Sequence, residues 1–323
     1  MASFPKRQHE RGIRLKGDTS MKEYDLLIVG GGPAGLTAAA YALRKRMETM
    51  LISTELGGKT NYEFTLPGLE THLVIDGREI VSKFRSQVEY LDFARYIGKV
   101  TKLEKVVKGF AATTDERTFK GKAAIIATGV TPKRLNIPGE VEFLGRGVSY
   151  SAVSHASLFI DMDVAVIGNG YPALQAAAEL AQIAKKVNVI GVPKSHLNST
   201  LGRRLQESGK ATFLSAYEAK EIQGENSPEK LIVTSKATKE QTEIPVKGVF
   251  VELGYVTDTS MFPRLVKRTR DGRIIVSAKN QTNIPGLFAA GDVTDVNAQQ
   301  VLIAVGQGAN AALSAYDYLL NLK

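Results

Sequence analysis

One short segment constrains the fold more than any other: a glycine-rich turn at residues 30–35, between a branched apolar run and an alanine-rich run. The preceding residues 25–30 (DLLIVG) predict a buried parallel strand, and residues 36–45 predict a helix. A further branched run, residues 49–53, predicts the next strand. Strand, glycine turn, helix and strand in this order form a βαβ unit, which indicates a doubly wound α/β fold.

The turn has the spacing of a dinucleotide-binding loop. Gly30 permits a tight turn, Gly32 lets the backbone approach a pyrophosphate, and Gly35 allows close contact between helix and strand. The start of the helix supplies free N–H groups and the positive end of the helix dipole. The acidic residue expected near the end of the second strand is displaced, because Ser53 stands there and Glu55 follows two residues later.

The same pattern occurs again in the middle of the chain. Residues 164–167 predict a strand, residues 168–173 (GNGYPA) a turn, and residues 174–184 a helix. The last strand, residues 286–292, and the helix from 299 to 320 are expected to return to the first unit. We therefore predict an α/β protein with two Rossmann-like, three-layer ββα dinucleotide-binding domains, the second inserted in the first. The predicted division is a flexible basic leader (1–20), a first domain (21–134 and 263–323), an inserted domain (138–258) and linkers at 130–139 and 254–263.

The composition excludes several classes of function. No cysteine occurs among the 323 residues, so this chain forms no disulfide, thiolate metal site or redox-active dithiol. No apolar run approaches the roughly 18–20 residues that span a bilayer. The net charge is +9, of which the first 20 residues carry +3, without the aromatic-interleaved basic patch of nucleic-acid binders. The leader lacks the apolar centre of a secretory signal. We expect a cytoplasmic protein with no metal, membrane or nucleic-acid partner.

Five motifs together resemble one family. They are Gly30–Gly35, Gly57-Gly58, Ala127-Thr128-Gly129, residues 145–150 (GRGVSY) and residues 284–292 (IPGLFAAGD). In this order, from about residue 24 to residue 320, they resemble the low-molecular-weight thioredoxin reductases, class II pyridine nucleotide-disulfide oxidoreductases. The resemblance implies FAD in the first domain, an NAD(P)-type inserted domain, a homodimer and a rotation between domains.

The resemblance also assigns residues to the FAD site. A carboxylate such as Asp292 can hold a polyol chain, although a Gly-Asp pair could equally be only a helix cap. The implied FAD-binding residues are Gly30, Gly32, Pro33, Ala34, Gly35, Glu55, Gly57, Gly58, Thr60, Ala127, Thr128, Gly129, Gly291, Asp292, Gln299, Gln300 and Val301. The family has Arg-Gln where Gln299-Gln300 stand, and Lys59 is a cation that could compensate near a reduced flavin.

The first departure from the family is at its redox centre. Ser151 and Ser154 stand at the positions of the Cys-x-x-Cys pair, and His155 stands at the position of the following acid. A serine hydroxyl has no thiol–disulfide couple, so these catalytic positions are expected to be inactive in dithiol chemistry. His155 could donate a proton near pH 7, or could be only a solvated or helix-capping residue.

The second departure is in the inserted domain. Its expected ligand turn consists of Gly168, Asn169, Gly170, Tyr171, Pro172 and Ala173. The family follows the next strand with a basic run that grips the 2′-phosphate of NADPH, whereas this chain has Gly191-Val192-Pro193-Lys194. Arg203 and Arg204 either reach back or form a solvated helix face. Ordinary use of NADP or NAD is therefore not expected, and a second flavin or another ligand beside Tyr171 is an alternative.

These features predict a thioredoxin reductase-like, FAD-dependent oxidoreductase with an unidentified electron donor and acceptor. Three alternatives stay open: a ferredoxin- or flavodoxin-NAD(P) reductase-like enzyme, a cysteine-to-serine variant of a thioredoxin or disulfide reductase, and a non-catalytic flavin-binding sensor. An acidic electron carrier would suit a basic surface, and a thioredoxin-like protein would suit the family.

Overall fold

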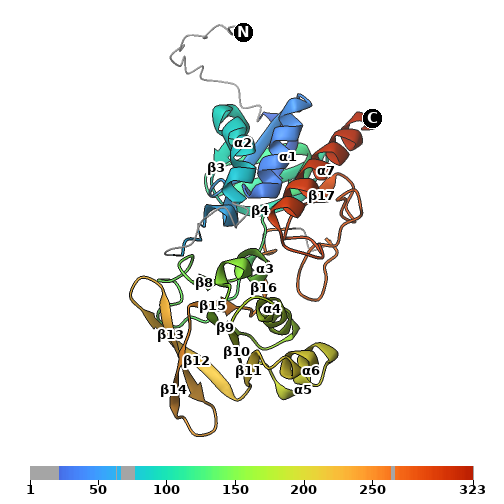
Figure 1. The fold of residues 1–323 in the computed structure, drawn as a ribbon. Helices are drawn as coiled ribbons and strands as arrows, with labels where there is room; N and C mark the ends of the chain where they lie inside the picture. The colour runs from blue at the N-terminus through green and yellow to red at the C-terminus, as the bar shows by residue number, and fades with distance from the viewer. Residues whose placement is uncertain (1–21, 63, 67–76, 263–265, 323) are drawn as a thin grey trace.

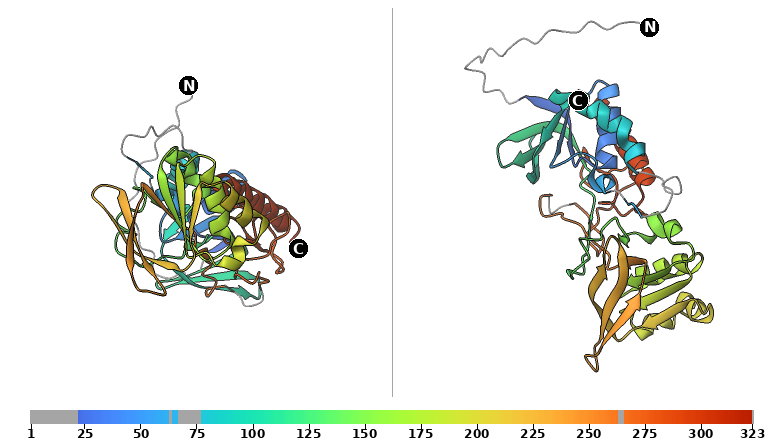
Figure 2. Two further views of the ribbon diagram at one scale, coloured as in Figure 1. Left: turned by 60° about the horizontal axis from the view of Figure 1, so that its bottom comes forward. Right: turned by 60° about the vertical axis from the view of Figure 1, so that its left-hand side comes forward.

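The computed structural model describes residues 22–62, 64–66, 77–262 and 266–322, and arranges them in two lobes (Figure 1). One lobe is built on a seven-stranded sheet and the other on a five-stranded sheet. The right-hand view of Figure 2 shows the two lobes one above the other along the length of the molecule. The predicted leader, residues 1–20, lies outside the described residues.

The first sheet has the strand order β3-β2-β1-β6-β5-β4, with β17 beside β6. The first half of β6 pairs antiparallel with β5, and its second half pairs in parallel with β17. The C-terminal strand therefore returns to the first sheet, as the sequence predicts. The strands are β1 (Glu23–Val29), β2 (Thr49–Ser53), β3 (Arg95–Ile97), β4 (Val100–Val106), β5 (Gly109–Thr114), β6 (Thr118–Ile126) and β17 (Leu287–Ala289).

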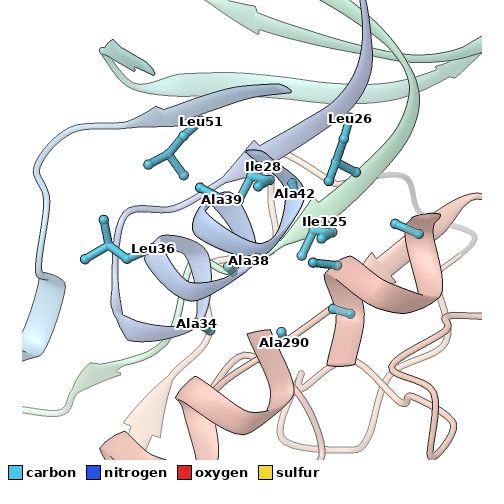
Figure 3. Packing of buried hydrophobic residues seen from close by; sticks show 14 of the residues in the cluster. Leu26, Ile28, Ala34, Leu36, Ala38, Ala39, Ala42, Leu51, Ile125 and Ala290 are labelled. Carbon is cyan, nitrogen blue, oxygen red and sulfur yellow. The ribbon is translucent and has the colours of Figure 1, made fainter. Parts of the chain in front are cut away.

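Alternating side chains of this sheet face two cores. Leu26 and Ile28 pack with the helices, whereas Leu27 and Val29 pack with the β4–β5 meander. The alanines of α1 let it lie close to Ile28 and Ile125 (Figure 3). The helical elements of this lobe are α1 (Pro33–Arg44), α2 (Gly77–Tyr90), α7 (Val301–Leu320) and the short 3-10 helices η1 (Gly58–Asn61) and η3 (Asp92–Ala94).

The second sheet is parallel, with the order β11-β10-β9-β15-β8. An antiparallel sheet, β12-β13-β14, packs on one face and helices pack on the other. Each lobe thus has three layers, which confirms the predicted α/β class. The elements are β8 (Val148–Ser149), α3 (Ala152–His155), η4 (Ala156–Phe159), β9 (Asp163–Ile167), α4 (Tyr171–Ala181), β10 (Lys186–Ile190), α5 (Lys194–Leu197), α6 (Thr200–Glu207), β11 (Ala211–Leu214), β12 (Tyr217–Gly224), β13 (Pro228–Ser235), β14 (Gln241–Pro245) and β15 (Gly248–Val251).

Two chain segments connect the lobes. They contain the short strands β7 (Thr131–Pro132) and β16 (Tyr255–Val256), which pair antiparallel with each other. Lys133 N–H also donates to the carbonyl oxygen of Gly254 at 2.9 Å. The regions expected to be linkers are therefore bound to each other. The domain bounds 21–134 with 263–323 and 138–258 stay a prediction.

Candidate functional site

Close backbone contacts shape the glycine turn after β1. Gly30 has a φ of 113°, and a Cβ added there would lie 2.3 Å from the carbonyl oxygen of Ala127. A Cβ added at Gly35 would lie 1.8 Å from the carbonyl oxygen of Gly30. Both positions therefore require glycine, because β1, α1 and the end of β6 approach one another closely here.

Gly32 lies on the open side of the same turn. Apart from its chain neighbours, no described atom lies within 4 Å of the place of its Cβ. Gly32 is also the N-cap of α1 and provides no capping side chain, so the following N–H groups are available to a ligand. Pro33 and Ala34 begin the helix, where the missing N–H of proline is harmless. Open space at the positive end of a helix fits the pyrophosphate of FAD.

The second glycine loop is attached to the first. Gly57 N–H donates to the carbonyl oxygen of Gly31 at 2.8 Å. A Cβ at Gly58 would lie 3.1 Å from the Cα of Gly32, so the two loops nearly touch. The hydroxyl of Thr60 donates to the carbonyl oxygen of Gly57 at 2.8 Å and stabilises the loop. The structure thus joins two motifs that the sequence predicted to share one site.

Two predicted cofactor residues have buried polar atoms that make no hydrogen bond to the described residues. They are Thr128 Oγ1, in the segment Ala127-Thr128-Gly129, and Gln299 Oε1. An unpaired buried polar atom costs roughly 1–3 kcal/mol, so both atoms fit a ligand that supplies their partners. Glu55 is exposed, and its carbonyl oxygen accepts the Ser53 hydroxyl at 2.7 Å.

The C-terminal strand and helix complete the first lobe at this edge. Gly291 N–H donates to Oε1 of Gln307 at 2.7 Å, a partner that the sequence analysis missed. Gln300 is the N-cap of α7 and makes no side-chain capping bond there. A Cβ at Gly308 would lie 2.1 Å from the carbonyl oxygen of Ala34, so α7 lies directly against the start of α1.

Lys59 forms an ion pair that extends toward the second lobe. Its Nζ lies 2.5 Å from Oδ2 of Asp292 and 5.1 Å from the centre of the Tyr255 ring. The Tyr255 hydroxyl donates to the carbonyl oxygen of Tyr150 at 2.9 Å. Burial, together with the nearby carboxylates of Glu252 and Asp292, raises the pKa of Tyr255, so the phenol stays protonated. The charge of Lys59 is thus already balanced by Asp292.

The serine segment forms a compact hydrogen-bonded group. Ser151 Oγ and Ser154 Oγ are 3.0 Å apart, and Nδ1 of His155 lies 2.8 Å from Oγ of Ser149. The His155 ring stacks on Phe64 with 4.2 Å between centroids. Burial lowers the pKa of His155 to about 4, so the imidazole is uncharged at neutral pH. In this state the ring carries no extra proton to donate near pH 7, and its contacts are with Ser149 and Phe64. His155 is also the N-cap residue of η4, without a side-chain capping bond, and its role stays a prediction.

Residues after the second glycine loop contact the serine segment. Besides the stacking of Phe64, Thr65 N–H donates to the carbonyl oxygen of Gly145 at 2.7 Å. Leu66 packs in the same apolar cluster as Ala152. The structure therefore brings the serine segment against the first lobe, through residues that carry no recognisable sequence signal.

The glycine turn of the second lobe, residues 168–173, joins β9 to α4. A Cβ at Gly168 would lie 2.6 Å from the Cβ of Ala173 and 2.6 Å from the carbonyl oxygen of Glu252. Gly170 is the N-cap of α4 and provides no capping side chain. The Tyr171 side chain at the helix start is 50% exposed. A tight glycine turn before an uncapped helix fits a nucleotide-like ligand, as it does in the first lobe.

The basic residues that could bind a 2′-phosphate are exposed on the surface of the second lobe. The segment after β10 reads Gly191-Val192-Pro193 before the exposed Lys194. Arg203 and Arg204 lie on α6 and are both exposed. The arginines therefore form a solvated helix face in this conformation.

Glu252 is an acid of the second lobe that the sequence analysis missed. It follows β15, and its Oε1 accepts the Ala152 N–H at 3.2 Å. Burial and the like charge of Glu179 raise the pKa of Glu252 to about 7. Glu252 thus touches both the serine segment and the turn at Gly168. An acid at the end of an apolar strand (GVFVEL) was the available signal.

The described ranges contain neither a cluster of metal ligands nor a membrane-spanning helix. Within them, no group of three or more His, Cys, Asp or Glu side chains could hold a metal ion. In the same ranges, no helix combines the length and the apolar character needed to cross a membrane.

Comparison with known sequences gives one family. Residues 24–308 match the family model of pyridine nucleotide-disulphide oxidoreductases. An NADH dehydrogenase from Bacillus subtilis is 34% identical over 299 residues, which are 92% of this chain. A component of the alkyl hydroperoxide reductase from Staphylococcus aureus is 34% identical over 300 residues, also 92% of this chain. The chain spans 59% of the length of these relatives.

Solved structures agree with this relationship. A thioredoxin reductase from Streptococcus pyogenes superposes with a TM-score of 0.82 at 34% identity, covering 93% of this chain and 99% of that one. A thioredoxin reductase from Giardia duodenalis gives a TM-score of 0.83 at 25% identity, covering 93% and 100%.

Proposed function

The chain belongs to the pyridine nucleotide-disulphide oxidoreductase family as a thioredoxin reductase-like member, and we propose that it is an FAD-dependent oxidoreductase without the family's internal dithiol step. Bound FAD supplies two-electron transfer between a donor and an acceptor. The single observation that carries this proposal is the Ser151–Ser154 pair, whose hydroxyls stand 3.0 Å apart in a chain that contains no cysteine.

The first lobe supplies the groups that hold the cofactor. The free N–H groups after Gly32 would donate hydrogen bonds to the pyrophosphate, and Asp292 would accept hydrogen bonds from hydroxyls of the ribityl chain. The unpaired Thr128 Oγ1 and Gln299 Oε1 supply polar contacts to the rest of the molecule. The uncapped start of α7 supplies a positive dipole end, which replaces part of the charge that an arginine would give.

The electron donor is not NADPH bound through a basic run at its 2′-phosphate, as in the family; it is another ligand. The proposal is supported by the segment after β10, which lacks a basic run, and by Arg203 and Arg204, which face solvent. A second flavin or another planar ligand on Tyr171 is the form of the second site that we favour. The acceptor is a separate molecule, for which an acidic electron carrier suits the net charge of +9.

An anaerobic titration tests the donor assignment. Purified protein is mixed with NADPH and then with NADH, while the flavin absorbance at about 450 nm is followed. We expect FAD to be present and to remain oxidised on the time scale of turnover. Prompt bleaching by either nucleotide would show that the second lobe still binds nicotinamide, and only the choice of acceptor would then be open.

A serine variant of a disulfide reductase is a second candidate, because the 3.0 Å contact of Ser151 and Ser154 also suits a replaced thiol pair. Introducing cysteine at both positions distinguishes this candidate from the first.

We also propose a homodimer that uses the outer face of α7. Leu302, Leu313 and Leu320 are 55%, 38% and 66% exposed along this helix, which lies at the edge of the first lobe (Figure 1). A row of exposed leucines on one helix suits a protein interface. Light scattering of the wild type and of Leu313→Lys tests it: a wild-type monomer would exclude the dimer.

A further inference from the structure

The carboxyl edge of the second sheet contains a switch in strand order. β10 and β11 lie on one side of β9, whereas β15 and β8 lie on the other side. The chain leaves β9 through α4 toward β10, whereas after β15 it leaves this sheet and enters the connecting segment that contains β16. Ligands of open α/β sheets bind at the carboxyl ends of the strands where neighbouring chain connections separate in this way. Gly168 follows β9 at this edge, and Glu252 follows β15.

Backbone bonds fix Glu252 at this edge of the sheet. Val251 pairs with Ile167 in the parallel ladder, and Glu252 N–H donates to the carbonyl oxygen of Ile167 at 2.8 Å. On its side chain, Oε1 accepts the N–H of Ala152 at 3.2 Å. Among the described residues Glu252 makes no other side-chain hydrogen bond, so its second carboxylate oxygen is available to a ligand.

Among the described residues, the charged groups that act on Glu252 are not basic. Glu179 of α4 acts on it as a like charge, and Tyr255 of β16 faces it as a neutral phenol. A partly buried carboxylate without a cation is unfavourable unless it is protonated or receives hydrogen bonds. A ligand group that suits this carboxylate is therefore a hydrogen-bond donor, and not another acceptor or an anion.

We infer that Glu252 is the specificity-determining residue of the second site, where its carboxylate accepts a hydrogen bond from an N–H group of a planar nitrogen heterocycle. Both a carboxamide on a nicotinamide ring and the imide of a flavin ring have this chemistry. The inference rests on the proposed function, because it assumes that the second lobe binds a ring ligand next to Tyr171. Glu179 acts on Glu252 as a like charge, and the inference gives it no contact with the ligand.

Binding of matched probes to the purified full chain tests this role. NADH is compared with ADP-ribose, which lacks the nicotinamide ring, and lumiflavin is compared with 3-methyllumiflavin, which lacks the imide N–H. Affinities are measured by equilibrium dialysis at about pH 6 and about pH 8 for the wild type, Glu252→Gln and Glu179→Gln. FAD content per chain is recorded in each sample.

In one of the two pairs, we expect the ligand that carries the N–H group to bind about tenfold more tightly at about pH 8 than at about pH 6. The reason is that its hydrogen bond to the ionised Glu252 is lost when the carboxylate is protonated. Glu252→Gln should remove this pH dependence, whereas Glu179→Gln should keep it with a lower midpoint. Which pair responds identifies the ring. Equal binding within both pairs, no binding of either, or an unchanged pH dependence in Glu252→Gln would overturn the inference. Full FAD content in that case leaves the proposed function intact, whereas a wild type that takes up no FAD contradicts the proposed function itself.

Discussion

Lys59 Nζ and Asp292 Oδ2 are 2.5 Å apart, which joins the glycine loop after β2 to the loop after β17. The two loops come from opposite ends of the chain and meet because β17 pairs with β6. The Asp292 side chain is only 11% exposed, so its charge needs a partner. In the proposed function the same carboxylate serves FAD, and therefore Lys59 stabilises the site before the cofactor arrives.

The Lys59–Asp292 pair predicts a measurable coupling. Lys59→Met should lower the free energy of unfolding by about 1 kcal/mol, since Lys59 is partly exposed and solvent screens the pair. Adding Asp292→Asn should recover most of the loss, because no unpaired charge remains. Urea unfolding of the FAD-free protein measures the cycle. Lys22→Met breaks an exposed pair with Glu48 and should change stability by less than about 0.5 kcal/mol. Equal effects at the two lysines would contradict the argument.

The first glycine turn predicts opposite effects at two of its glycines. Gly35→Ala places a Cβ 1.8 Å from a backbone oxygen, which should cost about 3 kcal/mol or more. Gly32→Ala enters open space with an ordinary φ of −72°, and should change stability by less than about 1 kcal/mol. Gly32→Ala should nevertheless lose FAD, because the added methyl occupies the pyrophosphate space. Thermal unfolding and the ratio of flavin to protein absorbance separate the two effects.

Cysteines at the serine positions test the lost redox step. In Ser151→Cys/Ser154→Cys the two sulfur atoms should form a disulfide on oxidation, since the present oxygens are 3.0 Å apart. We expect no reduction of thioredoxin or of an aromatic disulfide with NADPH, because the site lacks a cation for the 2′-phosphate and His155 is uncharged. Ser151→Ala/Ser154→Ala controls for loss of the hydroxyls. Robust NADPH-driven disulfide reduction would instead support the cysteine-to-serine alternative.

His155 predicts a loss of stability in acid. Its pKa is about 4 in the folded protein and near the ordinary 6.5 in the unfolded chain. Between these pH values the unfolded state binds more protons than the folded state. The uncharged His155 therefore contributes at most about 3 kcal/mol to the free energy of unfolding above pH 6.5, and this contribution is lost as the pH falls from 6.5 to 4. Glu252 acts in the opposite direction over an overlapping range. The comparison is therefore Glu252→Gln against Glu252→Gln/His155→Gln by urea unfolding, and parallel pH curves would refute the assignment.

Glu252 predicts a loss of stability as the pH rises. Its pKa is about 7 when folded and near the ordinary 4.5 when unfolded. Stability from the protonated form is complete below pH 4.5 and is lost as the pH increases through 7, by about 3 kcal/mol at most. As the pH rises between these values, the free energy of unfolding of Glu252→Gln should therefore increase relative to that of the wild type. The relative increase should be smaller for Glu179→Gln. Glu207→Gln, at an exposed position on α6, controls for the substitution itself. An identical gain in this control would argue against burial as the cause.

Local patterns predicted the regular parts of the fold. The second strand, expected at 49–53, is observed at Thr49–Ser53, because a run of branched residues between polar neighbours has one favourable conformation. The first turn was also predictable, since glycines at fixed spacing reflect contacts within one βαβ unit. By contrast, β12 was missed because its apolar residues do not alternate regularly. α2 was missed although Val81, Phe84 and Val88 recur at helical spacing.

The sequence by itself thus determined the α/β class, both glycine turns, the return of β17 and the absence of thiol chemistry within the chain. The tertiary structure alone decided the protonation of His155 and Glu252, and the pairing of Lys59 with Asp292. The physical reason is that glycine turns and apolar runs act on neighbours in the chain, whereas a pKa depends on burial and on every charge nearby in space. Phe64 on His155 and Glu179 beside Glu252 bring together distant residues, and only folding could reveal them.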